Sequence, residues 1–187
     1  MSAQPKTSDD LIREAARQLL EGGGVESISM QSVASAVGIQ APSLYKRFAS
    51  KTDLLASVTD DALKQLQGLI ESCVSPTEPK QSLQHMAAVY RSFAKGNPHT
   101  YQLIFAPTST SNLDAWLRSA APLLEVLKQE LGANRALPAA RTLVAFLHGF
   151  VSMELNGSFQ FGGNIDGAFE FGLATILNAL MPMAGPL

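Results

Sequence analysis

The chain contains little of what a disulfide scaffold, a metal site or a membrane anchor requires. Its 187 residues include one cysteine, Cys73, so no disulfide can form within the chain, and its three histidines are too scattered for a metal site. The N-terminus lacks a cationic flank followed by an apolar core, and no uninterrupted apolar run approaches the ~18 residues of a membrane span. We therefore expect a cytoplasmic protein with no metal, no cofactor and no membrane contact.

Catalytic signatures are missing from the sequence as well. It has no Ser/His/Asp or Cys/His spacing, no paired carboxylates in a segment suited to a cleft, and no glycine-rich phosphate loop after a strand. The glycines at 22 to 24 follow one helical pattern and precede another, so they predict a turn. No residue is predicted to be catalytic, although an all-α enzyme or small-molecule carrier with structural N-terminal helices stays open as the alternative function.

Positive charge is scarce, and the net charge of −2 at pH 7 argues at first against a nucleic-acid partner. The cations Lys46, Arg47 and Lys51 nevertheless lie in one short stretch, whereas most acids of the first 58 residues precede residue 27. Positive potential should therefore concentrate on one surface of an N-terminal module. Affinity for DNA would then require two such modules acting together.

The segment SMQSVASAVGIQAPSLYKRFASK, which starts at Ser29, predicts two short helices joined by a tight turn. Ser29 is a favourable N-cap residue, and Gly38 ends the first helix because glycine adopts a left-handed conformation at little cost. Pro42 falls in the first turn of the second helix, where its missing N–H costs nothing. Leu44 and Phe48 repeat at i, i+4 and predict the inward face of that helix.

The outward side of the second helix suits a DNA groove. It carries small, hydroxyl and cationic side chains, which match a floor of bases and walls of phosphates: Ala41, Ser43, Tyr45, Lys46 and Arg47. The next helix begins at Ser50, and Asp53 completes a capping box. Lys51 in its first turn opposes the helix macrodipole, which favours a phosphate in front of this helix end. Helical domains that never touch DNA also contain such turns, so the motif alone leaves both interpretations open.

The block from Asp10 to Val58 strongly resembles the DNA-binding domain of the tetracycline-repressor (TetR) family of transcriptional regulators. The matching features are Ala15 and Ala16, Gly24, Val33-Ala34, Val37-Gly38, Leu44-Tyr45, Phe48, Lys51 and Leu54-Leu55. The resemblance implies an all-α fold of about nine helices. A helix-turn-helix DNA-binding domain would occupy residues 1–50, and an effector-binding and dimerisation domain residues 51–187. A helix from about residue 51 to residue 73 would link the two domains.

The resemblance also implies which side chains meet DNA. Carried over by position, contacts to the DNA backbone fall on Ser29, Ser43, Tyr45 and Lys51. Groove-facing positions are Gln31, Ala41, Pro42 and Lys46, and Gln40 is a further DNA-binding position. The Gln31 amide can pair bidentately with adenine, whereas Ala41 is too short to hydrogen-bond a base. A family member of this kind is expected to be a homodimeric, ligand-responsive regulator, usually a repressor, that binds an inverted-repeat operator in double-stranded DNA.

Beyond residue 58 the sequence pattern stays helical, with helices expected over about 81–95, 97–106, 113–131, 138–156 and 165–180. The last helix has acids only at its start and no basic residue, so more than one of its faces should be buried. The resemblance implies a four-helix bundle between the last two long helices of two copies, and the residues assigned to it are Phe150, Phe169, Leu173, Ile176 and Leu177. A helix central to its own domain is the alternative.

The segments HGFVSMELNGSFQFG and GNPHTYQLIF look like the C-terminal domain of a TetR subgroup named for a Trp-His-Gly signature, although Leu147 replaces its Trp. In this family the effector cavity lies between helices of that domain. The residues predicted to line it are Tyr90, Phe93, Tyr101, Phe105, Trp116, Phe146 and Phe150. Such groups are also needed merely to build a core. Because charge is scarce there, the expected effector is small and mostly apolar or aromatic.

Overall fold

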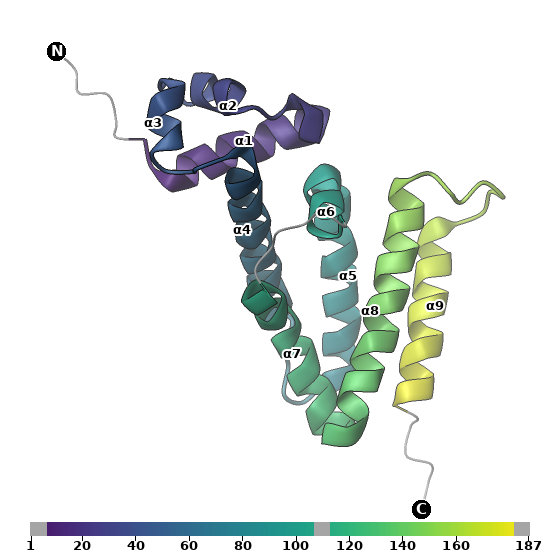
Figure 1. Ribbon diagram of the computed structural model, residues 1–187. Coiled ribbons are helices and arrows are strands. Elements are labelled where there is room, and N and C mark those ends of the chain that lie inside the picture. Colours follow the sequence, from purple (N-terminus) through teal and green to yellow (C-terminus); the bar gives the residue numbers. More distant parts are fainter. Residues whose placement is uncertain (1–6, 107–112, 182–187) are drawn as a thin grey trace, which may run out of the picture. The chain divides into compact units, whose positions relative to one another are not determined.

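The computed structural model describes residues 7–106 and 113–181 (Figure 1). Within these ranges the chain folds into nine α-helices and one short 3-10 helix, with no strand, which confirms the predicted all-α class. The elements are α1 (Asp9–Gly23), η1 (Val25–Ser27), α2 (Met30–Ala36), α3 (Ala41–Tyr45), α4 (Lys51–Glu71), α5 (Pro79–Gly96), α6 (Pro98–Ile104), α7 (Leu113–Leu131), α8 (Ala133–Leu155) and α9 (Ile165–Leu180).

The chain forms two compact units. The first unit contains Met1–Gln65 and Asn97–Trp116, and the second contains Leu66–Gly96 and Leu117–Leu187. The division therefore falls inside α4, and α6 belongs with the N-terminal helices. This differs from the boundary predicted between residues 50 and 51, because that prediction followed the sequence motif and had no information on where α6 packs.

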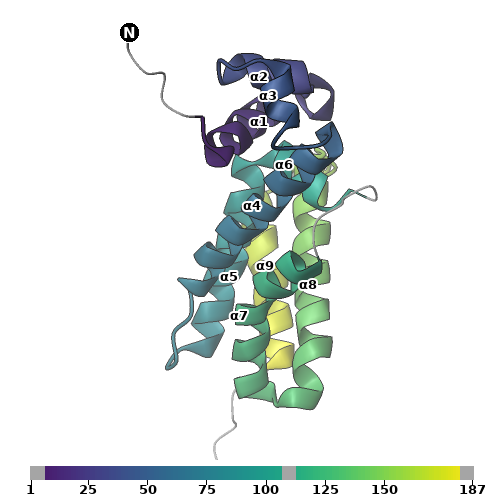
Figure 2. The same ribbon diagram turned by 60° about the vertical axis from the view of Figure 1, so that its left-hand side comes forward.

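The first unit is built around a closed apolar core. Ile12 and Leu20 of α1, Val33 of α2 and Leu44 of α3 are fully buried against one another. Burying each of these side chains contributes about 1.5–3 kcal/mol, so the core holds the short helices α2 and α3, which would be unstable alone. Leu54 at the start of α4 completes this core. Figure 2 shows α2 and α3 lying next to α1.

The second unit contains three helices that lie side by side, α5, α8 and α9 (Figures 1 and 2). Leu83 of α5, Leu143 and Val151 of α8, and Leu177 of α9 are almost completely buried between them. Helices α8 and α9 approach closely at Gly172, where an added Cβ would lie 2.6 Å from the ring of Phe146. A side chain at this position would therefore force the Phe146 ring to move away from α9.

Helix α8 begins at Ala133, earlier than the start predicted near residue 138. Gly132, with φ +77°, separates α7 from α8, and Pro138 is accommodated inside the helix. By length and composition α8 could cross a membrane, although core helices of soluble proteins pass the same test. Only a third of its most apolar stretch is buried within the structure. The remaining surface therefore leaves small and apolar groups uncovered in a single chain.

Candidate nucleic-acid interface

The start of α2 is fixed by a reciprocal pair of hydrogen bonds. The Ser32 backbone N–H donates to the Ser29 hydroxyl oxygen (2.9 Å), and the Ser29 backbone N–H donates to the Ser32 hydroxyl oxygen (2.9 Å). This capping box satisfies two N–H groups that a helix start would otherwise leave unpaired. The N-cap predicted at Ser29 is confirmed, and α2 is held with its N-terminal end exposed.

The turn between α2 and α3 is tight and uses a left-handed glycine. Gly38 has φ +70°, a backbone conformation that residues other than glycine adopt only at a cost in free energy. The Ile39 backbone N–H then donates back to the Ala34 carbonyl oxygen (2.9 Å), which closes the end of α2. Leu44 is fully buried and Phe48 nearly so, and both anchor α3 from beneath as predicted. The outer side of α3 is thereby presented to solvent on a rigid support.

The residues predicted to meet DNA lie on α2, α3 and the start of α4, and all of them have accessible surface. Tyr45 is 53% exposed despite its large ring. The others that are exposed are Ser29, Gln31, Gln40, Pro42, Ser43 and Lys46, while Ala41 and Lys51 are half-buried. An exposed aromatic ring among hydroxyl, amide and cationic groups is costly in water unless a partner covers it. The surface has the composition of a DNA-contacting face.

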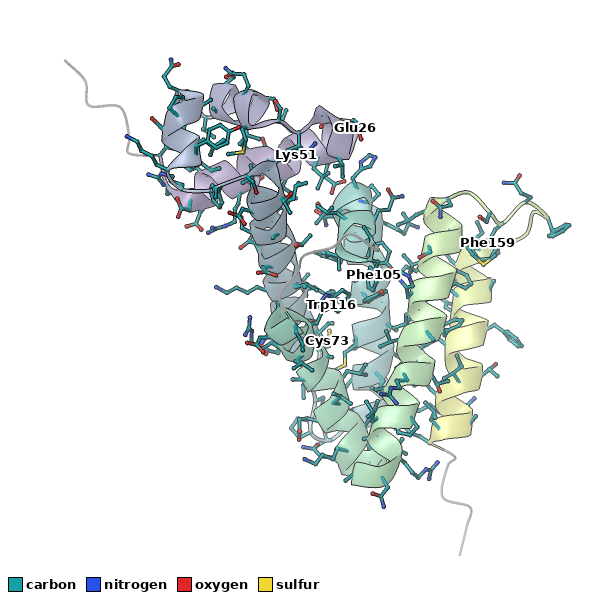
Figure 3. All side chains as sticks on the ribbon, in the orientation of Figure 1. Glu26, Lys51, Cys73, Phe105, Trp116 and Phe159 are labelled. Atoms are coloured by element: carbon teal, nitrogen blue, oxygen red, sulfur yellow. The ribbon has the colours of Figure 1, made fainter. Side chains whose placement is uncertain are left out.

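Lys51 sits at the first turn of α4, close to the turn that carries Glu26 (Figure 3). Its Nζ donates a hydrogen bond to the carbonyl oxygen of Val25 (2.8 Å). An ammonium group has three donors, so this bond orients the side chain and leaves donors for a phosphate. The helix start is capped by Ser50, whose hydroxyl oxygen accepts from the Asp53 N–H (3.1 Å). The Asp53 carboxylate returns to the Ala49 N–H and not to that of Ser50.

Arg47 belongs to a different interaction from the one predicted. Its guanidinium pairs with the Asp9 carboxylate at the start of α1, a residue that sequence reasoning did not connect with α3. In the free protein Arg47 is thus paired at the surface, and Lys46 and Lys51 are the other two cations of the predicted positive surface. Arg47 and Asp9 are 38 positions apart, and no local sequence pattern links them.

Glu21 is a second residue that the sequence did not single out. Its carboxylate accepts hydrogen bonds from the backbone N–H groups of His99 (3.1 Å) and Thr100 (2.8 Å), at the N-terminus of α6. Arg17, one turn earlier on α1, donates to the Asn97 side-chain oxygen (2.9 Å). Asn97 is the N-cap residue of α6, and its side chain makes no cap hydrogen bond. The Glu21 side chain, from the last turn of α1, thus caps the N-terminus of α6.

The seven aromatic residues assigned to an effector cavity fall into two groups in different units. In the first unit, the rings of Tyr101 and Phe105 lie 4.9 Å apart and those of Phe105 and Trp116 lie 5.0 Å apart (Figure 3). The other four belong to the second unit: Tyr90, Phe93, Phe146 and Phe150. Tyr90, Phe93 and Tyr101 are buried, and all seven differ from the residues that line the two grooves described below.

The residues assigned to a dimer interface also divide. Phe169, Leu173 and Leu177 are at most 6% exposed, because they pack inside their own unit. Their assignment to the interface stays a prediction: in a single chain these side chains already contribute to the core, and a uniformly apolar helix carries no sequence signal for which side faces inward. Ile176 and Phe150 are half-buried. The side of α9 that faces solvent carries Phe171, which is 76% exposed.

An ion-pair network stabilises the second unit. Arg91 of α5 donates two hydrogen bonds to the Glu154 carboxylate of α8 (both 2.7 Å) and one to Asp166 at the start of α9 (2.7 Å). The Arg91 guanidinium carbon also lies 4.7 Å from the ring centroid of Phe169. Hydrogen bonding from Arg91 holds the pKa of Glu154 below its usual value although burial raises it, and the Glu154 hydrogen bonds raise the pKa of Arg91.

Two grooves accompany these elements. The first unit has a groove of about 550 Å³ lined by the end of α1, the start of α4 and α6, including Thr52, Leu55 and His99. The second unit has one of about 770 Å³ between α5 and α9, with Ala88, Phe169 and Leu173 among its lining residues. In the described parts of the chain no cluster of three potential metal ligands occurs.

Known proteins match the chain in both halves. Residues 12–58 match the family model described as bacterial regulatory proteins, tetR family, and residues 83–176 match the model of the tetracyclin repressor-like C-terminal domain. Neither description mentions a Trp-His-Gly signature, so that subgroup stays a prediction. An uncharacterised HTH-type transcriptional regulator of Mycobacterium tuberculosis is 27% identical over 157 residues, which cover 81% of this chain and 72% of that protein.

Solved structures share the fold over nearly the whole length. A protein of unknown function from Rhodococcus sp. RHA1 has a TM-score of 0.81 at 19% identity, covering 96% of this chain and 98% of the other. A point variant of TetR from Acinetobacter baumannii AYE, solved in complex with minocycline, has a TM-score of 0.73 at 21% identity, covering 93% and 96%. Members of the TetR family are DNA-binding repressors that respond to ligands, and they are not enzymes. Together with the helix-turn-helix geometry of α2 and α3, the family matches show that this chain belongs to the TetR family of bacterial transcriptional regulators.

Proposed function

We propose that the protein represses transcription as a homodimer bound to an inverted-repeat operator and leaves DNA when a small, mostly apolar or aromatic effector binds. The observation that carries the DNA part is the outer face of α2 and α3, where Gln31, Ser43 and Tyr45 are exposed above a closed apolar core. Hydroxyl and amide groups on a rigid support suit the groove of a duplex. Such a regulator would act in the cytoplasm, where its operator is, without a membrane partner.

A dimer follows from the charge of this face as well as from the family. One copy offers few free cations on this face, because Arg47 is neutralised by Asp9. Two copies double the number of phosphate contacts and place two α3 helices in successive major grooves. Half-site centres should then lie about one helical turn, ~34–36 Å, apart or at a variation of that spacing.

The effector part of the proposal is supported by the aromatic composition of α5 to α8 and by the minocycline bound to the Acinetobacter relative. Helix α4 is one continuous helix whose start carries Lys51 and whose last turns belong to the second unit. An effector that shifts the last turns of α4 would displace Lys51 and the recognition helices. A coupling of ~1–3 kcal/mol would weaken operator binding by roughly 5- to 150-fold.

The decisive experiment is selection of bound fragments from genomic DNA, followed by fluorescence anisotropy on the selected sequence. We expect a two-fold symmetric site, and Lys51→Ala should weaken its binding, whereas Lys64→Ala, at an exposed α4 position, should not. Screening small aromatic compounds for release of that fragment then tests the effector. Selection that enriches no common sequence, or equal weakening by both lysine variants, would contradict the assignment of the DNA-binding face.

A further inference from the structure

The loop between α8 and α9 holds two phenylalanines in opposite environments. The ring of Phe159 packs on that of Phe150, with centroids 4.8 Å apart. Figure 3 shows Phe159 beside the end of α8 and the start of α9. Phe161, two residues later, is completely exposed, with a relative accessible surface of 106%. A large exposed aromatic side chain is a candidate contact residue where it belongs to a contiguous apolar patch.

The loop has a defined conformation that places Phe161 outside. The Ser158 backbone N–H donates to the Met153 carbonyl oxygen (2.8 Å), and the Gln160 side chain donates to the Gly157 carbonyl oxygen. Gly162 and Gly163 follow with φ +74° and +90°, which only glycine adopts without strain. The chain therefore folds back immediately after Phe161 and leaves its ring at the tip.

The surroundings of Phe161 favour a protein partner and not a lipid surface. The loop from residue 156 to residue 164 carries no charged side chain, whereas membrane-surface segments rely on Lys and Arg beside their apolar groups. The adjoining exposed sides of α8 and α9 carry Ala145, Gly149, Met153 and Phe171. Phe161 thus extends an apolar face that a second copy of the chain would cover.

The same unit also contains a complementary hollow. The groove between α5 and α9, about 770 Å³ in volume, has an apolar floor made by Phe169, Leu173 and Ala174, and the exposed Ala88 lies at its border. The charged groups at its border include Arg91 and Asp166, which neutralise each other across the groove (2.7 Å). These paired charges do not favour a charged ligand, and the apolar floor suits an aromatic ring.

We propose that, in the dimer, Phe161 of each protomer inserts into the α5–α9 groove of its partner. A two-fold dimer is self-complementary, so one projecting ring and one groove on each chain produce two equivalent contacts. Each contact crosses from the loop of one copy to α5 and α9 of the other and adds to the pairing of the α8 and α9 faces. This inference rests on the proposed dimer, but it concerns a contact that helix pairing alone does not require.

The test is the dissociation constant of the purified dimer, measured by sedimentation. Phe161→Ser should weaken the dimer at least about tenfold, the effect expected when a buried aromatic contact is lost. Phe161→Met keeps a large apolar side chain and should retain most of the affinity. Leu117→Ser removes another exposed apolar side chain, on α7, and should have no effect. A Phe161→Ser dimer as tight as the wild type overturns the proposal.

Filling the groove identifies the partner site. Ala88→Trp, at an exposed position of the groove, should weaken the dimer as Phe161→Ser does, and the double variant should be no weaker than either single variant because both remove the same contact. Additive effects would place Phe161 elsewhere on the partner and overturn the groove assignment. Binding of wild-type protein to anionic vesicles that Phe161→Ser abolishes, with an unchanged dimer, would also overturn it.

Phe171→Glu separates this inference from the dimer on which it rests. If Phe171→Glu gives monomers while Phe161→Ser behaves as wild type, the helix-paired dimer stands and the loop contact is wrong. If wild-type protein is monomeric, or Phe171→Glu leaves the dimer intact, the proposed α8–α9 interface itself fails and the loop contact falls with it.

Discussion

The outer face of α2 and α3 and the outer face of α8 and α9 differ in kind, although both are solvent-exposed in one chain. The first is polar and lies over a closed core in which Leu44 is fully buried. The second exposes Phe161 and Phe171, while the polar groups near it, Arg91 and Glu154, are turned inward and paired. The first surface thus lies over a core that is complete in one chain, whereas the second leaves two large aromatic side chains uncovered.

The largest effect should come from charging the two sides of α9 separately. Leu177 is fully buried and Phe171 is 76% exposed, six positions away on the same helix. Leu177→Glu places an unpaired carboxylate in the core and should prevent folding of the second unit. Phe171→Glu should leave the helical content intact and produce monomers.

Circular dichroism and light scattering distinguish the two outcomes. A dimeric Phe171→Glu protein would move the interface away from α9. A Leu177→Glu protein with unchanged thermal stability would mean that α9 packs with a different side inward.

The second effect concerns the ion pairs of Arg91 with Glu154 and Asp166. Arg91→Leu removes three hydrogen bonds, which leaves Asp166 without this partner and the Glu154 carboxylate with the Lys95 ammonium (3.1 Å) in place of its bidentate partner, so we expect a loss of ~2–4 kcal/mol in unfolding free energy, measured by urea denaturation. Ser92→Leu, at the adjacent exposed position, serves as the control and should change stability little.

The pH dependence sharpens this prediction. Because the pKa of Glu154 is lowered in the folded state, mainly by the Arg91 hydrogen bonds, its stabilisation is present above its unfolded value of about 4.5 and is lost as the pH falls through the folded value. Arg91→Leu should therefore lose less stability than the wild type between pH 5 and the acid limit. An identical decline in both proteins would assign the acid sensitivity to other carboxyl groups.

Much of the DNA-binding face was predictable because its signals are local. Ser29 as an N-cap, Gly38 in the turn and Pro42 in the first turn of α3 each act within a few residues, and all three are confirmed. The pairs Arg47–Asp9 and Glu21–Thr100 were not predictable, because they join residues far apart in sequence. They depend on how helices pack, which no short motif encodes.

The second unit was less predictable for a related reason. The range of α9 is confirmed at residues 165–180, but nearly all its residues are apolar, so no amphipathic pattern showed which side faces the core. Phe169 and Leu173, which were assigned to the dimer interface, contribute to the core of their own unit. The start of α8 was predicted near residue 138, where Pro138 is typical of a first helical turn, whereas Gly132 is the N-cap and Pro138 lies inside the helix.

The third effect tests the polar face directly. Gln31→Ala should cost ~1–3 kcal/mol of operator affinity and relax preference at one base position, since it removes a groove-reading amide. Lys51→Ala should weaken all sequences alike and lower the slope of log affinity against log salt by about one unit. Anisotropy titrations over a salt series with operator and scrambled DNA separate these roles. Equal losses on both DNAs for both variants would refute the division into reading and phosphate contacts.

The smallest effect should come from the capping of α6 by Glu21. Glu21→Gln keeps one side-chain acceptor for the N–H groups of His99 and Thr100 but loses the second acceptor and the negative charge that favours a helix N-terminus. We expect a loss of about 1 kcal/mol in the unfolding free energy, typical of a weakened cap. Glu26→Gln, at an exposed acid in the same unit, controls for the change in net charge and should leave stability unchanged. Because α1 also supports α2 and α3, the Glu21 variant should lose operator affinity only to the extent that the first unit loosens. A large loss of DNA binding at full stability would instead mean that Glu21 acts on the recognition surface by a route other than the α6 cap.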